Sequence, residues 1–315
     1  MKILVLGGCG YIGTKLVNDL LNKNLKIIVY DSQWFGNFLR PHKNLIVIKG
    51  DIRSINNKVF KNINTVIHLA NIANDPSVDL SPVLSWDVNV LSLIDILNKC
   101  KRNKVKQFIY SSSGSVYGIK KEKKVVEDLD LVPVSTYNKT KMIAERIILS
   151  FKDDFICHSI RPATVCGYSP RMRFDVSVNN LTIQALNDKV INVFGGNQIR
   201  PNVNIGDISR IFQHFVFNKN KIKPGFYNAG FENLSILEIA KIITQFTVAK
   251  INITKNTNDP RSYRLDSSKL LKTGFKPQYT VRDAIKDLIV MFKKKKLKAS
   301  NINYTVSWMK KNKIK

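Results

Sequence analysis

The chain has 315 residues, of which 44% are apolar, enough to bury a sizeable core and too many for an intrinsically disordered protein. Its net charge of +28 comes mainly from lysines dispersed along the whole chain, a pattern that disfavours a dedicated nucleic-acid-binding function. The sequence has no apolar run long enough for a membrane span, no typical signal peptide, and four cysteines without metal-ligand spacing, so we expect a cytoplasmic protein with no metal site.

The N-terminal half alternates between apolar runs typical of buried strands and amphipathic stretches typical of helices. Strands are predicted at Ile3–Leu6, Lys26–Tyr30, Leu45–Ile48, Thr65–Leu69, Gln107–Ser111 and Phe155–Ile160. Helices are predicted at Tyr11–Asn22, Pro82–Cys100 and Thr136–Ser150. The strands are apolar throughout, so both of their faces should be buried. The expected fold class is therefore α/β, with a doubly wound parallel Rossmann sheet.

After Pro162 the pattern is looser, and short strands mix with helices. Strands are predicted at Val190–Phe194, Val203–Ile205, Gly225–Asn228 and Lys250–Ile253, and helices near Asp175–Asn187, Asp207–Phe217, Ser235–Phe246 and Thr280–Phe292. We expect residues 1–166 to form the Rossmann domain, with 203–230 returning to it. Residues 167–202 and 231–300 should form a smaller C-terminal α/β domain, and 301–315 a basic tail.

A glycine-rich loop follows the first predicted strand, with GxxGxxG spacing at Gly7, Gly10 and Gly13. Glycines allow a sharp turn there and let a pyrophosphate approach the backbone, and the next helix directs its N-terminal N–H groups at the phosphates. The second strand is followed by Asp31, 18 residues after Gly13, where a carboxylate can bind both ribose hydroxyls and repel a 2′-phosphate. The pattern therefore favours NAD over NADP, although Asp31 could also be an ordinary turn residue.

Two further strand ends carry polar residues. Asp51 follows the third strand, where it could contact an adenine amino group or simply begin a turn or a helix. His68 closes the fourth strand among apolar neighbours, so a structural role is expected for it.

The fifth strand ends in a serine-rich segment, and about twenty residues later comes a YxxxK pattern. Tyr137 and Lys141 are four residues apart, so on a helix they share one face. A lysine ammonium beside a phenol stabilises the phenolate, which would make Tyr137 a usable base, and Ser113 could hold a substrate oxygen. The YxxxK pattern alone is common, but the order of glycine loop, acidic residue, serines and YxxxK is far more specific.

From Lys2 to about Ile289 the chain resembles an extended short-chain dehydrogenase/reductase of the NAD-dependent epimerase/dehydratase family, whose members act on nucleotide sugars. The resemblance implies a catalytic group of Ser113, Tyr137 and Lys141. It also implies that NAD is bound by Gly7, Gly10, Tyr11, Ile12, Gly13, Asp31, Asp51, Ile52, Leu69, Ala70, Asn89, Tyr137, Lys141 and Pro162.

The same resemblance implies a substrate-binding function for the C-terminal domain. Asn179 or its neighbour Asn180 matches a position that often binds the sugar diphosphate, and Arg200 matches an arginine that contacts the pyrophosphate. Arg261 lies in a late loop near the nucleotide, with an ion pair as the alternative role for it and for Arg171 and Arg173. The expected partners are a nucleotide-diphosphate sugar and a second copy of the chain, the latter also because two predicted helices are apolar on more than one face.

The reaction implied by the family begins at a sugar hydroxyl, expected at C4, where Tyr137 takes the proton and NAD⁺ takes the hydride. A 4,6-dehydratase also needs an acid–base pair directly after the catalytic hydroxyl, and here those positions are Gly114 and Ser115. The favoured function is therefore a C4 epimerase. A 4-ketoreductase or a dehydratase is the alternative, and a non-catalytic NAD-binding or RNA-binding member is less favoured because all three catalytic residues are present. Departures from the family at Asn204 and Asn256 leave open which nucleotide base and which sugar are bound, and Asn71 replaces a small residue that would lie at the floor of the pocket.

Overall fold

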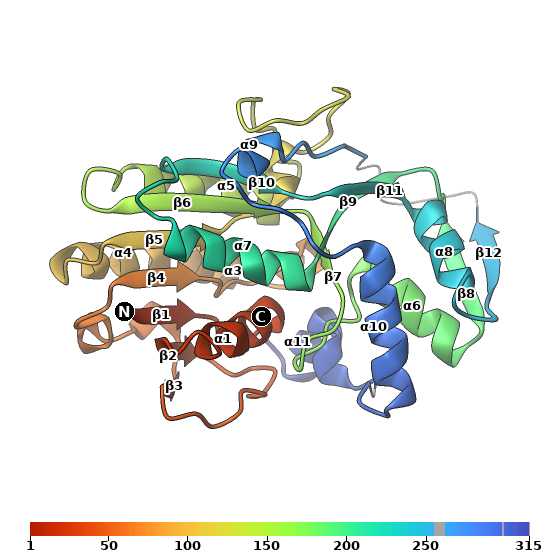
Figure 1. Cartoon of the computed structure of the whole chain (residues 1–315), viewed down its shortest axis with the longest axis horizontal. Helices are drawn as coiled ribbons and strands as arrows, with labels where there is room; N and C mark the ends of the chain where they lie inside the picture. The colour runs from red at the N-terminus through yellow and green to blue at the C-terminus, as the bar shows by residue number, and fades with distance from the viewer. Residues whose placement is uncertain (255–261, 298, 315) are drawn as a thin grey trace.

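The computed structural model describes residues 1–254, 262–297 and 299–314. Within them, a central sheet of parallel strands has the order β10-β6-β5-β4-β1-β2-β3 (Figure 1). The strands are β1 (Lys2–Leu6), β2 (Lys26–Asp31), β3 (Leu45–Lys49), β4 (Thr65–His68), β5 (Gln107–Ser111), β6 (Ile156–Pro162) and β10 (Gly225–Ala229). The chain builds outward from β1 to β3 and then returns to place β4 on the other side of β1. This reversal confirms the doubly wound fold and opens a crevice at the carboxyl ends of β1 and β4.

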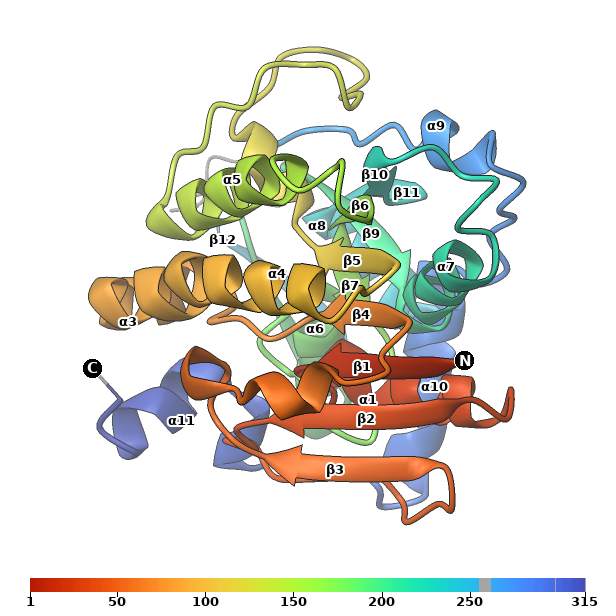
Figure 2. The ribbon, with the colours of Figure 1, turned by 90° about the vertical axis from the view of Figure 1, so that its left-hand side faces the viewer.

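Helices cover both faces of this sheet (Figure 2). One face carries α1 (Tyr11–Leu21) and α7 (Ile205–Phe217). The other carries α3 (Pro82–Trp86), a π-helical turn at Asp87–Leu91, α4 (Ser92–Arg102) and α5 (Thr136–Leu149).

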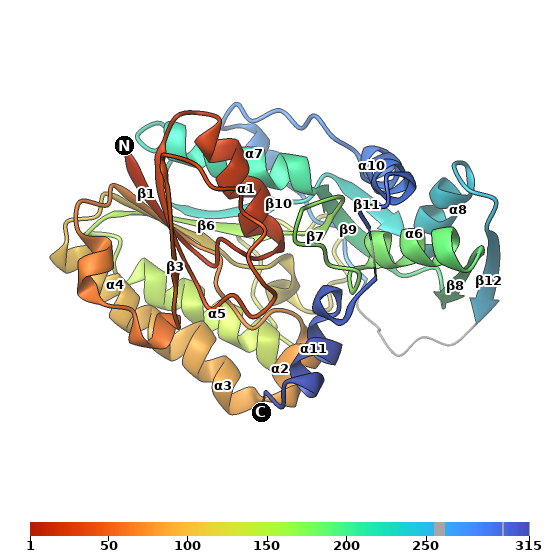
Figure 3. The ribbon, with the colours of Figure 1, turned by 90° about the horizontal axis from the view of Figure 1, so that it is seen from below.

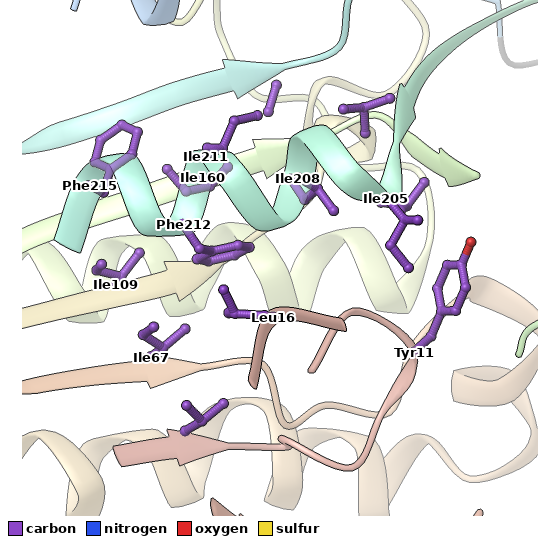
Figure 4. Packing of buried hydrophobic residues seen from close by; sticks show 14 of the residues in the cluster. Tyr11, Leu16, Ile67, Ile109, Ile160, Ile205, Ile208, Ile211, Phe212 and Phe215 are labelled. Carbon is purple, nitrogen blue, oxygen red and sulfur yellow. The ribbon is translucent and has the colours of Figure 1, made fainter. Parts of the chain in front are cut away.

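The core on the α1 side shows why these segments fold together (Figure 4). Ile208 and Phe212 of α7 and Leu16 of α1 lie over the sheet, where they meet the isoleucines Ile67, Ile109 and Ile160. All six side chains are fully buried. Each such burial contributes about 1.5–3 kcal/mol, so this layer fixes the sheet whose edge carries the site.

A smaller group of elements lies beyond the carboxyl ends of the sheet (Figure 1). It comprises α6 (Ser177–Asn187), α8 (Ile236–Thr244), α10 (Val281–Lys293), the parallel pair β8 (Val190–Phe194) and β12 (Lys250–Thr254), and the strands β7 (Thr164–Cys166), β9 (Ile199–Asn204) and β11 (Glu232–Ser235). Short helices are α2 (Asp75–Leu80), α9 (Ser268–Leu271) and 3₁₀ turns at Ile52–Ser54, Asn57–Phe60, Gly114–Tyr117 and Asn301–Asn303. Among the described residues, no helix is long and apolar enough to cross a membrane.

The last residues differ from the basic tail expected for them. They fold back as α11 (Thr305–Lys311), which lies beside α2 at the carboxyl-end side of the sheet (Figure 3). Its Met309 is buried, and the ring of Trp308 stacks on that of Trp34. These apolar contacts order a segment whose lysines alone suggested a solvated end.

Candidate active site

A cleft of about 470 Å³ opens at the crevice between β1 and β4, and a smaller hollow of about 120 Å³ adjoins it. The cleft is lined by the expected Gly7, Gly10, Tyr11, Ile12, Gly13, Leu69, Ser113, Tyr137, Lys141, Pro162 and Arg200. The hollow is lined by Asp31, Asp51, Ile52 and Ala70, and shares Gly7, Gly10 and Leu69 with the cleft. Residues from many separate segments therefore meet around one continuous space.

The glycine loop has the shape expected for a pyrophosphate cradle. Gly7 has φ +83°, and a Cβ there would lie 2.5 Å from the backbone N of Ala70. A Cβ on Gly13 would lie 2.4 Å from the carbonyl O of Gly7, so both positions require glycine. α1 begins after Gly10 with no side-chain cap among the described residues and no acidic residue in its first turn. Its first N–H groups are thus available to an anion, and the loop fits a dinucleotide.

Two carboxylates border the smaller hollow. Asp31 accepts hydrogen bonds from the backbone N of Cys9 at 2.9 Å and of Gln33 at 2.6 Å, and burial raises its pKa. Asp51 caps the 3₁₀ turn by accepting from the backbone N of Arg53. It also pairs with that guanidinium at 2.6 Å, and the hydrogen bonds from Arg53 lower its pKa. Asp51 therefore has the expected capping role, in a position that also faces the hollow.

Lys141 is buried at the cleft and held by a backbone hydrogen bond. It is 3% exposed, and its Nζ donates a hydrogen bond to the carbonyl O of Ser111 at 2.7 Å. The Nζ lies 4.7 Å from the ring centre of Tyr110 and 5.9 Å from that of Tyr137. Burial lowers the pKa of Lys141 to about 7, against an opposing effect of the Glu145 carboxylate. α5 therefore places beside the Tyr137 ring a lysine that changes between its charged and neutral forms near neutral pH.

The serine segment completes the expected catalytic group. The hydroxyls of Ser113 and Ser115 lie 2.8 Å apart, and Ser113 also accepts from the backbone N of Ser115. A Cβ on Gly114 would lie only 3.3 Å from the carbonyl O of Pro162. The position after Ser113 has little room for a carboxylate, and the next position offers only a hydroxyl.

Among the described residues, the arginines that line the cleft are Arg171, Arg173 and Arg200. Arg173 pairs with Asp175 at 2.8 Å inside the cleft rather than on the surface. Arg171 is 3% exposed, stacks 4.0 Å above the Phe35 ring, and leaves its Nε without a partner in the described part of the chain. Burial, and secondarily Arg173, lowers its pKa to about 9. Arg261 and Asn256 lie outside the described residues.

Two expected contact residues lie behind the cleft wall instead of in it. Asn89, in the π-helical turn, binds the backbone N of Ile72 at 2.8 Å and its carbonyl O at 3.2 Å. Asn179 accepts from the backbone N of Gly167 at 2.9 Å and donates to the Tyr11 hydroxyl at 3.1 Å. Both are fully buried, and neither lines the cleft or the hollow. In this structure they brace residues that do.

The departures Asn71 and Asn204 lie in different places. Asn71 lines both the cleft and the hollow, and with its amide oxygen toward Lys141 it accepts from the Nζ at 3.2 Å. Asn204 lies away from the cleft and caps α7 through Gly206. Of these two residues, Asn71 is therefore the one that contacts Lys141.

Further residues line the cleft or adjoin residues that line it. Glu145 and Arg161 are buried and form a bidentate pair, with Arg161 Nε and Nη2 at 2.9 and 2.8 Å from the two carboxylate oxygens. Glu145 is four residues after Lys141, so the helical period could have indicated it. Trp34, Phe35, Thr305 and Met309 also line the cleft, and no local pattern indicated them.

Comparisons with known proteins agree with this geometry. The family model described as the NAD dependent epimerase/dehydratase family matches residues 3–230. The chain belongs to this family. A UDP-glucose 4-epimerase of Lactobacillus helveticus is 28% identical over 89% of this chain and 93% of its own length. The chain itself also resembles proteins of known structure, among them the following two.

The first of these is a UDP-glucuronic acid 4-epimerase from Bacillus cereus in complex with UDP-glucuronic acid and NAD. It has 28% identity and a TM-score of 0.81, with coverage of 93% of this chain and 99% of that one. The second is MoeE5 in complex with UDP-glucuronic acid and NAD, with 25% identity and a TM-score of 0.83 over 94% and 100% of the two chains.

Proposed function

We propose that the protein is an NAD-dependent C4 epimerase of a nucleotide-diphosphate sugar. The observation that carries this proposal is the buried Lys141 beside Tyr137, in a cleft that also holds Ser113 and the glycine loop. The likeness to named 4-epimerases supports the isomerase class.

Each residue has a separate task in this proposal. NAD, when bound at the glycine loop, supplies a nicotinamide that oxidises and then reduces the sugar carbon. Tyr137 takes the hydroxyl proton and later returns it, while the Lys141 ammonium favours the phenolate. The Ser113 hydroxyl holds the reacting oxygen, and Arg200 binds the diphosphate through its planar fork.

Epimerisation fits this residue set better than elimination. Loss of water from C5 and C6 needs a second acid and base, and the two positions after Ser113 carry Gly114 and Ser115. Epimerisation needs only the one base, provided that the sugar can present its other face.

A uronic acid is the substrate that the cleft favours within this class. Arg171 and Arg173 add positive charge near Tyr137, and Arg173 interacts electrostatically with that residue. Asp175 and Asp31 act on the buried Arg171 electrostatically, but its Nε has no hydrogen-bond partner among the described residues. A substrate carboxylate would supply that partner together with a further negative charge, whereas a neutral hexose would supply no charge. Similarity to structures that contain UDP-glucuronic acid supports the same choice.

The test is an assay of the purified protein with NAD⁺ and, in turn, UDP-glucose, UDP-N-acetylglucosamine and UDP-glucuronic acid in D₂O. We expect the C4 epimer of UDP-glucuronic acid to form fastest, with unchanged mass, no net NADH and no deuterium at C5. Tyr137→Phe should fold and bind NADH but lose about 10²- to 10⁴-fold in turnover.

Other products would overturn the assignment in recognisable ways. Stoichiometric change in NADH would indicate an oxidoreductase, and a 4-keto-6-deoxy sugar with deuterium at C5 a dehydratase. Loss of CO₂ from the uronic acid would indicate a decarboxylase. If the neutral sugars are epimerised faster than UDP-glucuronic acid, the epimerase assignment stands but the choice of a uronic acid as substrate is wrong.

A further inference from the structure

The C-terminal helix α11 lies where the carboxyl ends of β1 and β2 open into the site (Figure 2). Its Thr305 and Met309 line the cleft. The family model ends at residue 230, well before this helix. α11 is therefore an element of the site that the family match does not cover.

Aromatic contacts join α11 to the segment that follows β2. The rings of Trp34 and Trp308 stack with centres 5.5 Å apart and planes 19° apart, and Phe35 lies 5.0 Å from Trp308. The Arg171 guanidinium in turn stacks on the Phe35 ring, 4.0 Å from its centre. We call Trp34, Phe35 and Trp308 the aromatic cluster.

The other side of the C-terminal segment is tied to the chain that carries the arginines. The carbonyl O of Asn303 accepts from the backbone N of Phe174 at 2.9 Å, and the backbone N of Thr305 donates to Asp175 at 3.2 Å. The segment thus bridges residues 171–175 and the residues after β2, two parts of the chain far apart in sequence.

The aromatic cluster lies beside the cofactor cradle. Trp34 and Phe35 line both the cleft and the smaller hollow, which share Gly7 and Gly10 of the pyrophosphate loop. They therefore stand at the junction of the two spaces. The buried Arg171 adds an unpartnered Nε here, among the described residues, that a ligand oxygen can satisfy.

We propose that α11 completes the cofactor site, with Trp308 holding Trp34 and Phe35 over the bound NAD(H) and thereby slowing its release. The proposal rests on NAD as the cofactor of the proposed function. Slow release suits an epimerase, because the cofactor is regenerated in every cycle and has no need to leave. In this scheme Trp308 is a positioning residue that acts through the loop after β2.

The test measures NADH release from the full-length protein without any sugar. Protein loaded with NADH is mixed with excess NAD⁺, and the change in NADH fluorescence gives the dissociation rate. Trp308→Ala should release NADH about 3- to 30-fold faster, because it removes a stacked pair and its buried area. The release rate of Trp308→Phe should fall between those of the wild type and Trp308→Ala. Ser307→Ala, on the exposed face of the same helix, should release NADH at the wild-type rate.

Trp34→Ala tests the same contact from the other side and serves if Trp308→Ala does not fold. The double variant should release NADH no faster than the faster single variant, since both lose one shared interaction. Unchanged release from a folded Trp308→Ala, or additive effects in the double variant, would overturn the proposal. Neither of these results depends on turnover, so the proposed function can still hold when this proposal fails. If Trp308→Ala releases NADH faster but the wild type epimerises none of the sugars, only the proposed function is rejected.

Discussion

Lys141 shows at the scale of one residue how the site trades stability for chemistry. Its pKa of about 7 is well below the ordinary value of 10.5. Burial therefore disfavours the charged form of Lys141 in the folded protein relative to the unfolded chain, where the side chain is solvated. Below pH 7 the charged lysine must be buried, so the full cost is present there. The cost fades as the unfolded lysine loses its proton toward pH 10.5, and stability should rise over that interval.

Lys141→Met should therefore stabilise the cofactor-free protein while it abolishes turnover. We expect the free energy of unfolding to rise by about 2 kcal/mol at pH 6.5, less than the pKa shift alone implies because the hydrogen bond to Ser111 is lost. The gain should largely vanish by pH 10. Urea unfolding at the two pH values measures this, with Lys139→Met on the exposed face of α5 as the control. Equal or lower stability at pH 6.5 would show that burial does not oppose the charge.

Asp31 supports a second prediction, on the choice of cofactor. Its buried carboxylate borders the smaller hollow, where it would bind the ribose hydroxyls and repel a 2′-phosphate. We expect the protein to bind NADH more tightly than NADPH, and Asp31→Ala to reduce that preference by about tenfold, roughly 1.4 kcal/mol.

Isothermal titration with both cofactors measures this preference. Asp51→Ala is the matched control, because Asp51 borders the same hollow and its loss should weaken both cofactors alike without changing their ratio. Wild-type protein that binds NADPH as tightly as NADH would contradict the assignment.

At the scale of elements, the Rossmann strands were predictable because each is a continuous apolar run between turn residues. The observed ends of these strands differ from the predicted ends by only a residue or two; β2, for example, extends to Asp31 instead of Tyr30. The helix predicted at Pro82–Cys100 is interrupted by the π-helical turn at Asp87–Leu91. This turn is associated with the contact of Asn89 with Ile72, which the helical period cannot reveal.

The candidate site divides in the same way. Ser113, Tyr137, Lys141 and the glycine loop follow from local motifs, because each motif lies at a strand end or on one helix face. The stack of Trp308 on Trp34 joins residues at opposite ends of the chain, and no spacing rule connects them. Arg171 stacks on Phe35, which is far from it in sequence, so its burial also cannot be predicted from a local pattern.

At the scale of the whole molecule, the outer face of α3 and α4 remains apolar although the sheet beneath is already covered. Val83, Leu91 and Ile94 are 75%, 58% and 42% exposed. Their spacing places them on one side of the helical stretch. An exposed apolar face of this kind marks an interaction surface, and a two-fold axis would cover it with the same face of a second copy.

We therefore expect a homodimer formed through α3 and α4, and light scattering at micromolar concentration should give about twice the monomer mass of 35.9 kDa. Because each copy carries a net charge of +28, the copies repel one another, and added salt should strengthen the dimer by screening this repulsion. Leu91→Lys should yield a folded monomer that still binds NADH. Val248→Lys, 83% exposed outside this face, should remain dimeric. A wild-type mass near 35.9 kDa, or a dimeric Leu91→Lys, would place the interface elsewhere or remove it.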